Sequence, residues 1–242
     1  MLTAIITGVS RGLGEALALE LLARECRVLG MGRSSSGRLG GERYGFVSCD
    51  LADVAGLPAI VHPAFDAVAA RRPTGLCLIN NAATLDPVGV LGTAEASDIA
   101  ASIAVNLIAP IVLSGLFCRV FDDDAIGRRI VNISSGAAQS TLPGESLYCI
   151  GKAGLEMLTR SLAAEHTSPQ FRAITVRPGV IDTAMQSFAR AQPKDLLPSV
   201  ELFKGFHADA RLVPPEIVAR KLVERLVLAA VDHGRTYSYA EL

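Results

Sequence analysis

The residues best suited to chemistry are a tyrosine and a lysine, Tyr148 and Lys152, four positions apart. On a helix this spacing places both side chains on one face, about 5–6 Å apart at Cβ. A phenol has a pKa of about 10 and transfers protons poorly at neutral pH, whereas a nearby ammonium stabilises the phenolate. The pair predicts a tyrosine of lowered pKa that exchanges a proton. The alternative is an ordinary amphipathic helix with an incidental Tyr and Lys.

A serine, Ser135, stands thirteen positions before Tyr148 and just after the apolar run 129–133. That run has the composition of a strand, so Ser135 is expected at its C-terminal end. Open α/β sheets bind their ligands at such ends. The sequence therefore predicts that a hydroxyl joins the Tyr/Lys pair.

A glycine-rich turn follows the first apolar run and precedes a helical pattern of leucines and alanines. Glycines let the backbone approach a ligand closely, and free N–H groups with the helix dipole attract anions. This placement predicts a pyrophosphate site, although three residues separate Gly8 from Gly12, unlike the GxGxxG form. The turn reads TGVSRGLG, and its expected ligand contacts are Gly8, Ser10, Arg11, Gly12, Leu13 and Gly14.

The end of the second expected strand carries a cation where many dinucleotide sites carry an acid. An acidic residue there would bind the ribose hydroxyls and favour NAD. The sequence has Gly32-Arg33-Ser34 instead, and Arg11 could reach the same place. Because a guanidinium suits a phosphate fork, the pattern predicts NADP(H) as cofactor. The alternative is two solvated surface arginines.

Three later strand ends supply further candidates. Asp50 either accepts from the adenine amino group or caps the next helix. The small residues of NNAA at 80–83 let a cofactor pass close to the backbone, while the asparagines can tie neighbouring strands. RPGVIDT at 177–183 places a hydroxyl after a Pro-Gly turn, which suits the nicotinamide carboxamide or is simply a turn. The expected cofactor contacts here are Asp50, Leu51, Asn81, Ala82, Pro178, Gly179, Val180 and Thr183.

Short apolar runs alternate with helical patterns along the whole chain. This alternation predicts an α/β fold: a single-domain, Rossmann-type, doubly wound parallel sheet of about seven strands with helices on both faces. Neither an internal repeat nor an interdomain linker is visible. The expected strands are 2–6, 27–31, 44–48, 75–79, 129–133, 173–176 and 235–239, and the expected helices are 15–24, 58–70, 94–121, 148–166 and 215–231.

Composition argues against several classes of protein. The 242 residues are 50% hydrophobic with a net charge of −1 and no basic block, which suits a large core and argues against nucleic acid as a partner. The five cysteines are scattered without a CxxC, and the four histidines lack ligand spacing. We therefore expect buried thiols in a reducing, cytoplasmic compartment, no metal site and no secretory signal.

One uncharged stretch, 99–118, is long enough to span a bilayer. Asn106 and Pro110 within it favour instead a helix buried in a soluble core or a subunit interface, and hence a homodimer or homotetramer without membrane contact. Asn106 needs hydrogen-bond partners in such a helix. It is either a core polar tie or a kink residue that orders a water beside the Tyr/Lys pair.

Together these motifs resemble the short-chain dehydrogenase/reductase family. TGVSRGLG, NNAA, Asn106, the block from NISS to YCIGK, and RPGVIDT occur in the family's order over nearly the whole chain. The segments MQSFAR, LVPPE and GRTYSYAEL are similar to the sepiapterin-reductase-like and benzil-reductase branch. Two positions depart from the family pattern: Ala83 replaces the glycine usual in NNAG, and Gly151 the serine often found before the lysine.

The resemblance implies a role for each candidate. Tyr148 would be the acid/base, and Lys152 would lower its pKa and bind the nicotinamide ribose. Ser135, favoured over Ser134 by the thirteen-residue spacing, would hold the substrate carbonyl, and Asn106 the proton-relay water. The implied activity is NADPH-dependent reduction of a small-molecule ketone, aldehyde or dicarbonyl, with the reverse alcohol oxidation also open.

The segment 184–213 has no firm periodicity and is either a lid over the substrate or a surface loop with short helices.

Two other functions use the same fold. A non-catalytic NADP-sensing protein would bind the cofactor without oxidising it, and an isomerase or dehydratase would not oxidise it overall. Residues that would line an apolar substrate pocket, or else belong to the core, are Leu142, Pro143, Met185, Phe188 and Phe203.

Overall fold

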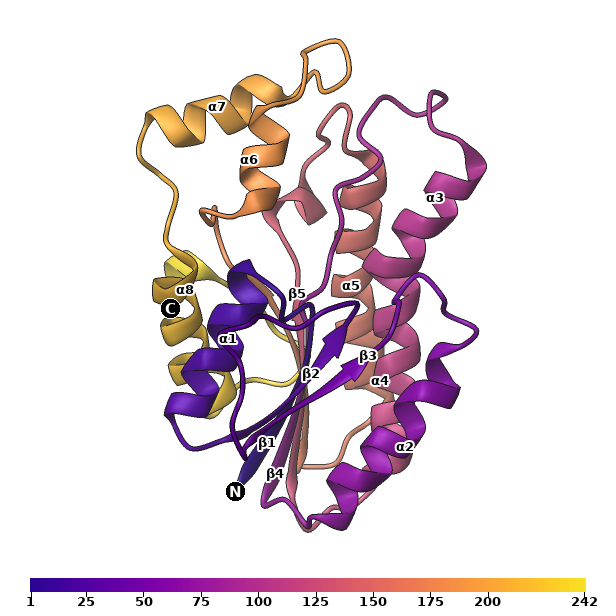
Figure 1. The fold of residues 1–242 in the computed structure, drawn as a ribbon, viewed down its shortest axis with the longest axis vertical. Coiled ribbons are helices and arrows are strands. Elements are labelled where there is room, and N and C mark those ends of the chain that lie inside the picture. The colour runs from indigo at the N-terminus through magenta and orange to yellow at the C-terminus, as the bar shows by residue number, and fades with distance from the viewer.

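A single seven-stranded sheet forms the centre of the protein, which we describe from a computed structural model of all 242 residues (Figure 1). The strand order is β3-β2-β1-β4-β5-β6-β7, and every neighbouring pair is parallel. The predicted α/β class is confirmed, with each strand close to its expected place. The strands are β1 Leu2–Thr7, β2 Arg27–Gly32, β3 Tyr44–Ser48, β4 Gly75–Asn80, β5 Gly127–Ile133, β6 Phe171–Arg177 and β7 Thr236–Ser238.

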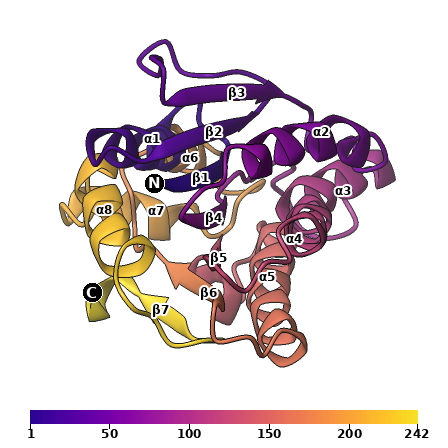
Figure 2. The same cartoon turned by 90° about the horizontal axis from the view of Figure 1, so that it is seen from below.

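Helices cover both faces of the sheet, so two apolar cores form (Figure 2). One core lies under α1 and α8, and the other under α2 and α4, with α5 beside α4. Each core receives alternate side chains of the same strands, because successive residues of a strand point to opposite faces. The main helices are α1 Gly12–Ala23, α2 Leu57–Ala70, α3 Ala96–Ile103, α4 Ala109–Val120, α5 Ser146–Glu165 and α8 Pro215–Leu222, the last extended by the π-helix η3 Val223–Val227.

The strand order reverses between β1 and β4, since β2 and β3 lie to one side and β5 to β7 to the other. The connections after β1 and β4 therefore leave the sheet in opposite directions and open a crevice at the carboxyl ends of the strands. The glycine turn follows β1, and the NNAA segment begins at the end of β4. The topology thus brings the predicted cofactor segments to one edge of the sheet.

The long apolar stretch is one helical column with a π-helical turn, η1 Ala104–Ile108, between α3 and α4. Within residues 96–120, an 18-residue window has a mean hydropathy of 2.1, which is enough for a membrane span by length and composition alone. Of that window, 44% is buried within the protein. Leu113 and Phe117 of α4 belong to the core under α2 and α4. The irregularity expected around Asn106 is confirmed.

Asn106 is fully buried in η1 and uses its amide to hold another segment. Its Oδ1 accepts from the Thr84 backbone N–H at 2.9 Å, and its Nδ2 donates to the Thr84 carbonyl at 2.9 Å and to Ser102 Oγ at 3.3 Å. The core polar tie is therefore confirmed, because the whole amide is satisfied by protein groups.

Helix α5 lies unusually close to the π-turn. A Cβ at Gly151 would come within 2.8 Å of Asn106 Cβ, and a Cβ at Gly154 within 2.6 Å of Leu107 Cδ1. At Gly151 the atom in the way is a Cβ, so a methyl group there requires the backbone to move, whereas at Gly154 the atom in the way is the end of the Leu107 side chain. The departure from serine at position 151 is thus explained by contact with η1.

A Gly151→Ala substitution is expected to destabilise the fold by about 1–2 kcal/mol, because overpacking against η1 exceeds the gain in helix propensity. Gly205→Ala is the matched control, since Gly205 is also helical and has nothing within 4 Å of its would-be Cβ. The control should gain about 0.5–1 kcal/mol. Urea unfolding of both variants measures the difference, and equal stabilisation would contradict the close approach of α5.

Candidate active site

The carboxyl ends of the strands surround one elongated cavity of about 1770 Å³. It runs from the glycine turn to two short helices, α6 Ala184–Arg190 and α7 Val200–Ala208, which lie within the segment expected to be a lid or a loop. Every predicted site residue lines this cavity except Asn106, which is buried and holds the cavity residue Thr84. The structure therefore brings together residues that the sequence separates by up to 175 positions (Gly8 to Thr183).

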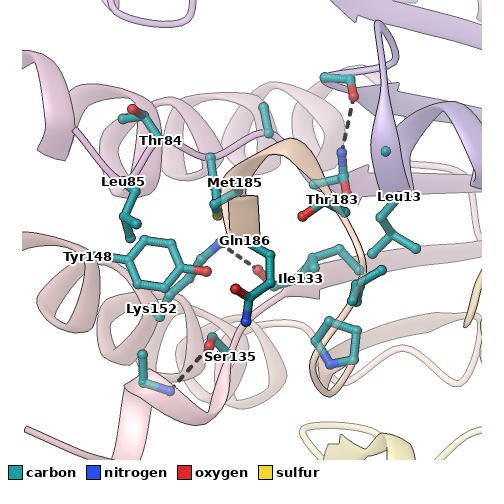
Figure 3. Close-up of a pocket in the computed structure, with 18 of the residues that line it drawn as sticks. Leu13, Thr84, Leu85, Ile133, Ser135, Tyr148, Lys152, Thr183, Met185 and Gln186 are labelled. Carbon is teal, nitrogen blue, oxygen red and sulfur yellow. Dashed lines mark hydrogen bonds between the residues drawn. The ribbon is translucent and has the colours of Figure 1, made fainter. Parts of the chain in front are cut away.

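Tyr148, Lys152 and Ser135 meet near the middle of the cavity (Figure 3). Lys152 Nζ lies 5.4 Å from the centre of the Tyr148 ring and donates to the Ile133 carbonyl at 2.8 Å. Ser135 Oγ accepts from the Ala137 N–H at 3.2 Å, which starts the 3₁₀-helix η2 Gly136–Gln139. The Ser135 and Tyr148 hydroxyls thus lie side by side at the end of β5, where one substrate atom can contact both.

The neighbouring serine is directed elsewhere. Ser134 is buried, and its Oγ donates to Glu156 Oε1 at 3.0 Å. Glu156 also accepts two hydrogen bonds from Arg177, each of 2.7 Å. The choice of Ser135 rather than Ser134 for the site is therefore supported by where each hydroxyl points.

Desolvation dominates the electrostatics of Tyr148 and Lys152. Burial raises the pKa of Tyr148 to about 12, against the opposing effect of the Ser135 hydroxyl. Burial also lowers the pKa of Lys152 to about 8. In the protein groups by themselves, desolvation outweighs the influence of an ammonium that is itself desolvated. Lys152 consequently releases its proton more readily than an exposed lysine. The predicted lowering of the tyrosine pKa, which included a charged cofactor ring, stays a prediction.

The glycine turn has the shape of a phosphate cradle. A Cβ at Gly14 would lie 2.1 Å from the Gly8 carbonyl oxygen, so the turn folds back on the first turn of α1. No side chain caps the N-terminus of α1, which begins at Gly12. Its first N–H groups and the positive end of the helix dipole therefore suit a pyrophosphate.

Two arginines at this end of the cavity have no partner in the protein. Arg11 and Arg33 are exposed, line the cavity, and form neither an ion pair nor a side-chain hydrogen bond. Nearby Arg38, in contrast, pairs with Glu15 at 3.6 Å and does not line the cavity. Both free guanidinium groups are thus available to an anion beside β2.

At the third strand end, Asp50 Oδ1 accepts from the Ala52 N–H at 2.9 Å. The alternative that Asp50 caps the next helix is wrong, because α2 begins at Leu57 and its N-cap is Gly56. Asn81 ties two strand ends as expected: its Nδ2 donates to the Thr7 carbonyl at 2.9 Å. These contacts hold the walls of the cofactor end of the cavity.

The two short helices close the other end of the cavity. Ala189, Leu197 and Val200 form a small apolar cluster with Leu85, against which the Tyr148 ring packs. Three of the expected pocket residues, Leu142, Met185 and Phe203, line the cavity, whereas Pro143 and Phe188 do not.

Two polar residues of the cavity were missed by sequence reasoning. Glu145 is 2% exposed and directly precedes α5; burial raises its pKa to about 7, against a hydrogen bond donated by Ser199 at 3.3 Å. Gln186 of α6 is 6% exposed. Glu145 stands three positions before Tyr148 and Gln186 lies in the MQSFAR segment, so spacing and motif could have indicated both.

Comparison with known proteins agrees with this geometry. A family model described as short chain dehydrogenase matches residues 2–194. The chain is 32% identical to a benzil reductase ((S)-benzoin forming) of Bacillus cereus, over 90% of this chain and 91% of that protein. It is 33% identical to the sepiapterin reductase of Mus musculus, over 90% of this chain and 89% of that protein. The crystal structure of the KRED1-Pglu enzyme matches with a TM-score of 0.85 at 25% identity, over 98% of this chain and 100% of that one.

The chain therefore belongs to the short-chain dehydrogenase/reductase family of oxidoreductases, which use nicotinamide cofactors. Within that family its relatives include benzil and sepiapterin reductases, which confirms the branch predicted from MQSFAR and the C-terminal motifs.

The raised pKa of Glu145 makes stability pH-dependent. The carboxyl binds a proton more tightly in the folded than in the unfolded protein. Its contribution to the free energy of unfolding is therefore full below about pH 4.5 and is lost as the pH rises through about 7. Relative to Glu145→Gln, the wild type should lose about 3 kcal/mol of unfolding free energy between pH 5 and pH 8. Urea unfolding at both values measures this, and a pH-independent difference would show that the carboxyl is not desolvated.

Proposed function

We propose that the protein is an NADPH-dependent carbonyl reductase acting on a ketone, aldehyde or dicarbonyl, with the reverse oxidation of the alcohol available. The observation that carries the proposal is the convergence of the Ser135 and Tyr148 hydroxyls beside buried Lys152, in a cavity continuous with the glycine turn. The relatives named as benzil and sepiapterin reductases support a carbonyl substrate.

The residues around the glycine turn fit the dinucleotide. Arg11 and Arg33 would hold the 2′-phosphate that distinguishes NADPH, since neither is neutralised by a protein carboxylate. The first turn of α1 would hold the pyrophosphate, and Asp50 with Leu51 the adenine. Asn81 and Ala82 would contact the nicotinamide end of the cofactor, and Lys152 would contact its ribose. The carboxamide would contact the segment Pro178, Gly179, Val180 and Thr183.

The protein's own groups carry out proton transfer and charge stabilisation. When bound, the reduced nicotinamide supplies a hydride to the carbonyl carbon. Ser135 and Tyr148 donate hydrogen bonds to the carbonyl oxygen, and these strengthen as negative charge develops there. Tyr148 then transfers its proton to that oxygen, and Lys152, with a pKa of about 8, replaces it. The raised pKa of Tyr148 favours the protonated phenol that this direction requires.

Asn106 has an indirect part in this proposal. Its side chain is occupied by Thr84 and Ser102, so it would place the proton-relay water through the π-turn that it stabilises.

A non-catalytic sensor is disfavoured because the acid, the lysine and the serine all lie in one cavity. An isomerase or dehydratase is distinguished by the absence of net NADPH oxidation.

We further propose a soluble, cytoplasmic homodimer or homotetramer with no nucleic-acid or membrane partner. Helices α4 and α5, with the adjoining π-turn, expose an apolar face, to which Ile108, Ile111, Ile150 and Met157 contribute. A second copy of the chain would cover these side chains. Residues 1–242 would form a single NADP-binding catalytic domain, with α6 and α7 as a substrate lid at about 184–213.

Tyr148→Phe should reduce turnover of a carbonyl substrate by at least about 10²-fold while NADPH binding is retained, because only the transferable proton is removed. Tyr237→Phe is the matched control: its hydroxyl accepts from the Asp232 N–H at 2.8 Å and lies outside the cavity. NADPH oxidation followed by absorbance measures turnover, and cofactor fluorescence measures binding. Full turnover in Tyr148→Phe would remove the basis of the proposal.

Arg33→Ala should weaken NADPH binding about 10- to 100-fold while NADH binding changes little, because a charge-assisted contact to the 2′-phosphate is lost. Arg38→Ala, which removes a paired arginine outside the cavity, should affect neither cofactor. Titration calorimetry with both dinucleotides provides the measurement. Equal losses for NADPH and NADH would exclude a phosphate role for Arg33.

A further inference from the structure

A second cavity, of about 360 Å³, lies at the amino ends of the strands, at the opposite edge of the sheet from the active site (Figure 2). The first residues of β4, β5 and β6 surround it together with the segment that follows η3. Three arginines line this cavity, Arg128, Arg129 and Arg172, and no aspartate or glutamate does. The charged side chains of its wall are therefore all cations.

The protein itself neutralises only the first of these arginines. Arg128 Nη1 lies 3.3 Å from Asp122 Oδ1, and its Nη2 pairs with Asp124. The hydrogen bonds of Arg129 and Arg172 go instead to backbone carbonyls, and neither residue forms an ion pair. Two uncompensated positive charges therefore remain in the wall of the cavity.

These two arginines lie side by side. Arg129 and Arg172 are register partners in the parallel ladder between β5 and β6, so their side chains point to the same face of the sheet. Two positions further along each strand, Val131 and Ile174 belong to the core under α1 and α8. Burial lowers the pKa of Arg129, and the charge of Arg172 lowers it further. Like charges placed opposite each other on neighbouring strands are destabilising, so this pair requires an explanation.

The structural contacts of the pair use only one nitrogen of each guanidinium. Arg129 Nη1 donates to the last two carbonyls of η3, at 2.5 and 2.7 Å, which satisfies the C-terminus of that helix. Arg172 Nη1 donates to the Phe171 carbonyl at 2.7 Å and to the Ser168 carbonyl at 3.4 Å. The Nε and Nη2 groups of both arginines have no acceptor in the protein, and Arg129 Nε is also shielded from solvent. Capping η3 therefore explains neither the free donors nor the second arginine.

Charge and shape indicate what kind of ligand suits this cavity. A phosphate group on an organic molecule carries a charge of about −1.5 to −2 at pH 7, which matches two guanidinium groups better than the single charge of a carboxylate. Its oxygens also accept the paired hydrogen bonds that a guanidinium fork donates. The apolar part of the wall, which would contact an organic moiety, consists of Leu2, Leu76, Val227 and Val231.

We propose that Arg129 and Arg172 form a binding site for a phosphate group, either free or carried as a monoester by a small organic molecule. Binding neutralises two adjacent cations and supplies acceptors for their free N–H groups. The site lies at the edge of the sheet opposite the active-site cavity and does not depend on the reductase function.

The test is an NMR titration of the ¹⁵N-labelled protein with inorganic phosphate, phenyl phosphate and benzoate, each against chloride at the same ionic strength. The backbone and Nε–H signals of Arg129 and Arg172 should shift saturably with both phosphates. Benzoate should bind at least about tenfold more weakly than phenyl phosphate, because it carries less charge and fewer acceptor oxygens. Phosphate that binds at the glycine turn is recognised separately, from the signals of Gly12 and Arg33.

Arg172→Met should weaken phenyl phosphate binding at least about tenfold, as measured from the Arg129 Nε–H signal. Arg27→Met is the matched control, because Arg27 is also half-buried at the start of a strand, forms no ion pair and does not line the cavity. The control should bind as the wild type does. Should Arg172→Met fail to fold, the Nε–H signals of both arginines in the wild type decide the question.

Tighter binding of phenyl phosphate than of inorganic phosphate would support a monoester as the ligand, and equal binding would support free phosphate. The proposal would be overturned if neither phosphate shifted the signals of the two arginines saturably, if benzoate bound as tightly as phenyl phosphate, or if Arg172→Met bound phenyl phosphate normally. None of these outcomes bears on the reductase function, which is measured by NADPH oxidation.

Discussion

The structure depends on burying one ammonium group. Lys152 is 2% exposed, carries no carboxylate partner, and is held by a single hydrogen bond to the Ile133 carbonyl at the end of β5. Desolvating a cation in this way is costly, and the lowered pKa of Lys152 shows the cost. The packing around α5 must therefore offset this desolvation cost. The position of Tyr148 then follows from the position of α5.

Several independent contacts keep α5 against the sheet. Gly151 and Gly154 let it approach the π-turn, and the Ser134 hydroxyl donates to Glu156 with the Lys152 carbonyl also within 3.3 Å of its Oγ. A buried polar chain runs from Asn80 through Asn132 to Thr159 of α5, with hydrogen bonds of 2.8 Å at each link. These groups bear no chemistry of their own. They fix the helix that carries the tyrosine and the lysine to the strand that carries Ser135.

The cavity is polarised along its length. One end offers two unpaired arginines and an uncapped helix N-terminus, which suit anionic phosphates. The other end is apolar and contains a few hydrogen-bonding groups, among them Glu145 and Gln186. Tyr148 lies between the two regions, and its ring packs against the cluster formed with α6 and α7. The groups suited to phosphates and the groups of the apolar end therefore come from separate parts of the chain, which meet at one phenol.

The amino-acid sequence by itself determined the fold class, the strand that each motif follows and most of the candidate site. Glycine spacing, apolar runs and the Tyr148/Lys152 interval are local features, and helix and strand geometry convert them directly into positions. It also indicated the irregularity at Asn106 and the cationic cofactor end.

Only the tertiary structure decided the electrostatics and the substrate end. The pKa values of Tyr148, Lys152 and Glu145 depend on desolvation by segments far apart in the chain, which no local pattern reports. The tertiary structure likewise excluded Asp50 as the cap of α2, and it showed that the Asn106 amide ties η1 to the Thr84 backbone. Such relations exist only once α5, β5 and α6 are folded together, because each is a distance between residues that the sequence does not place side by side.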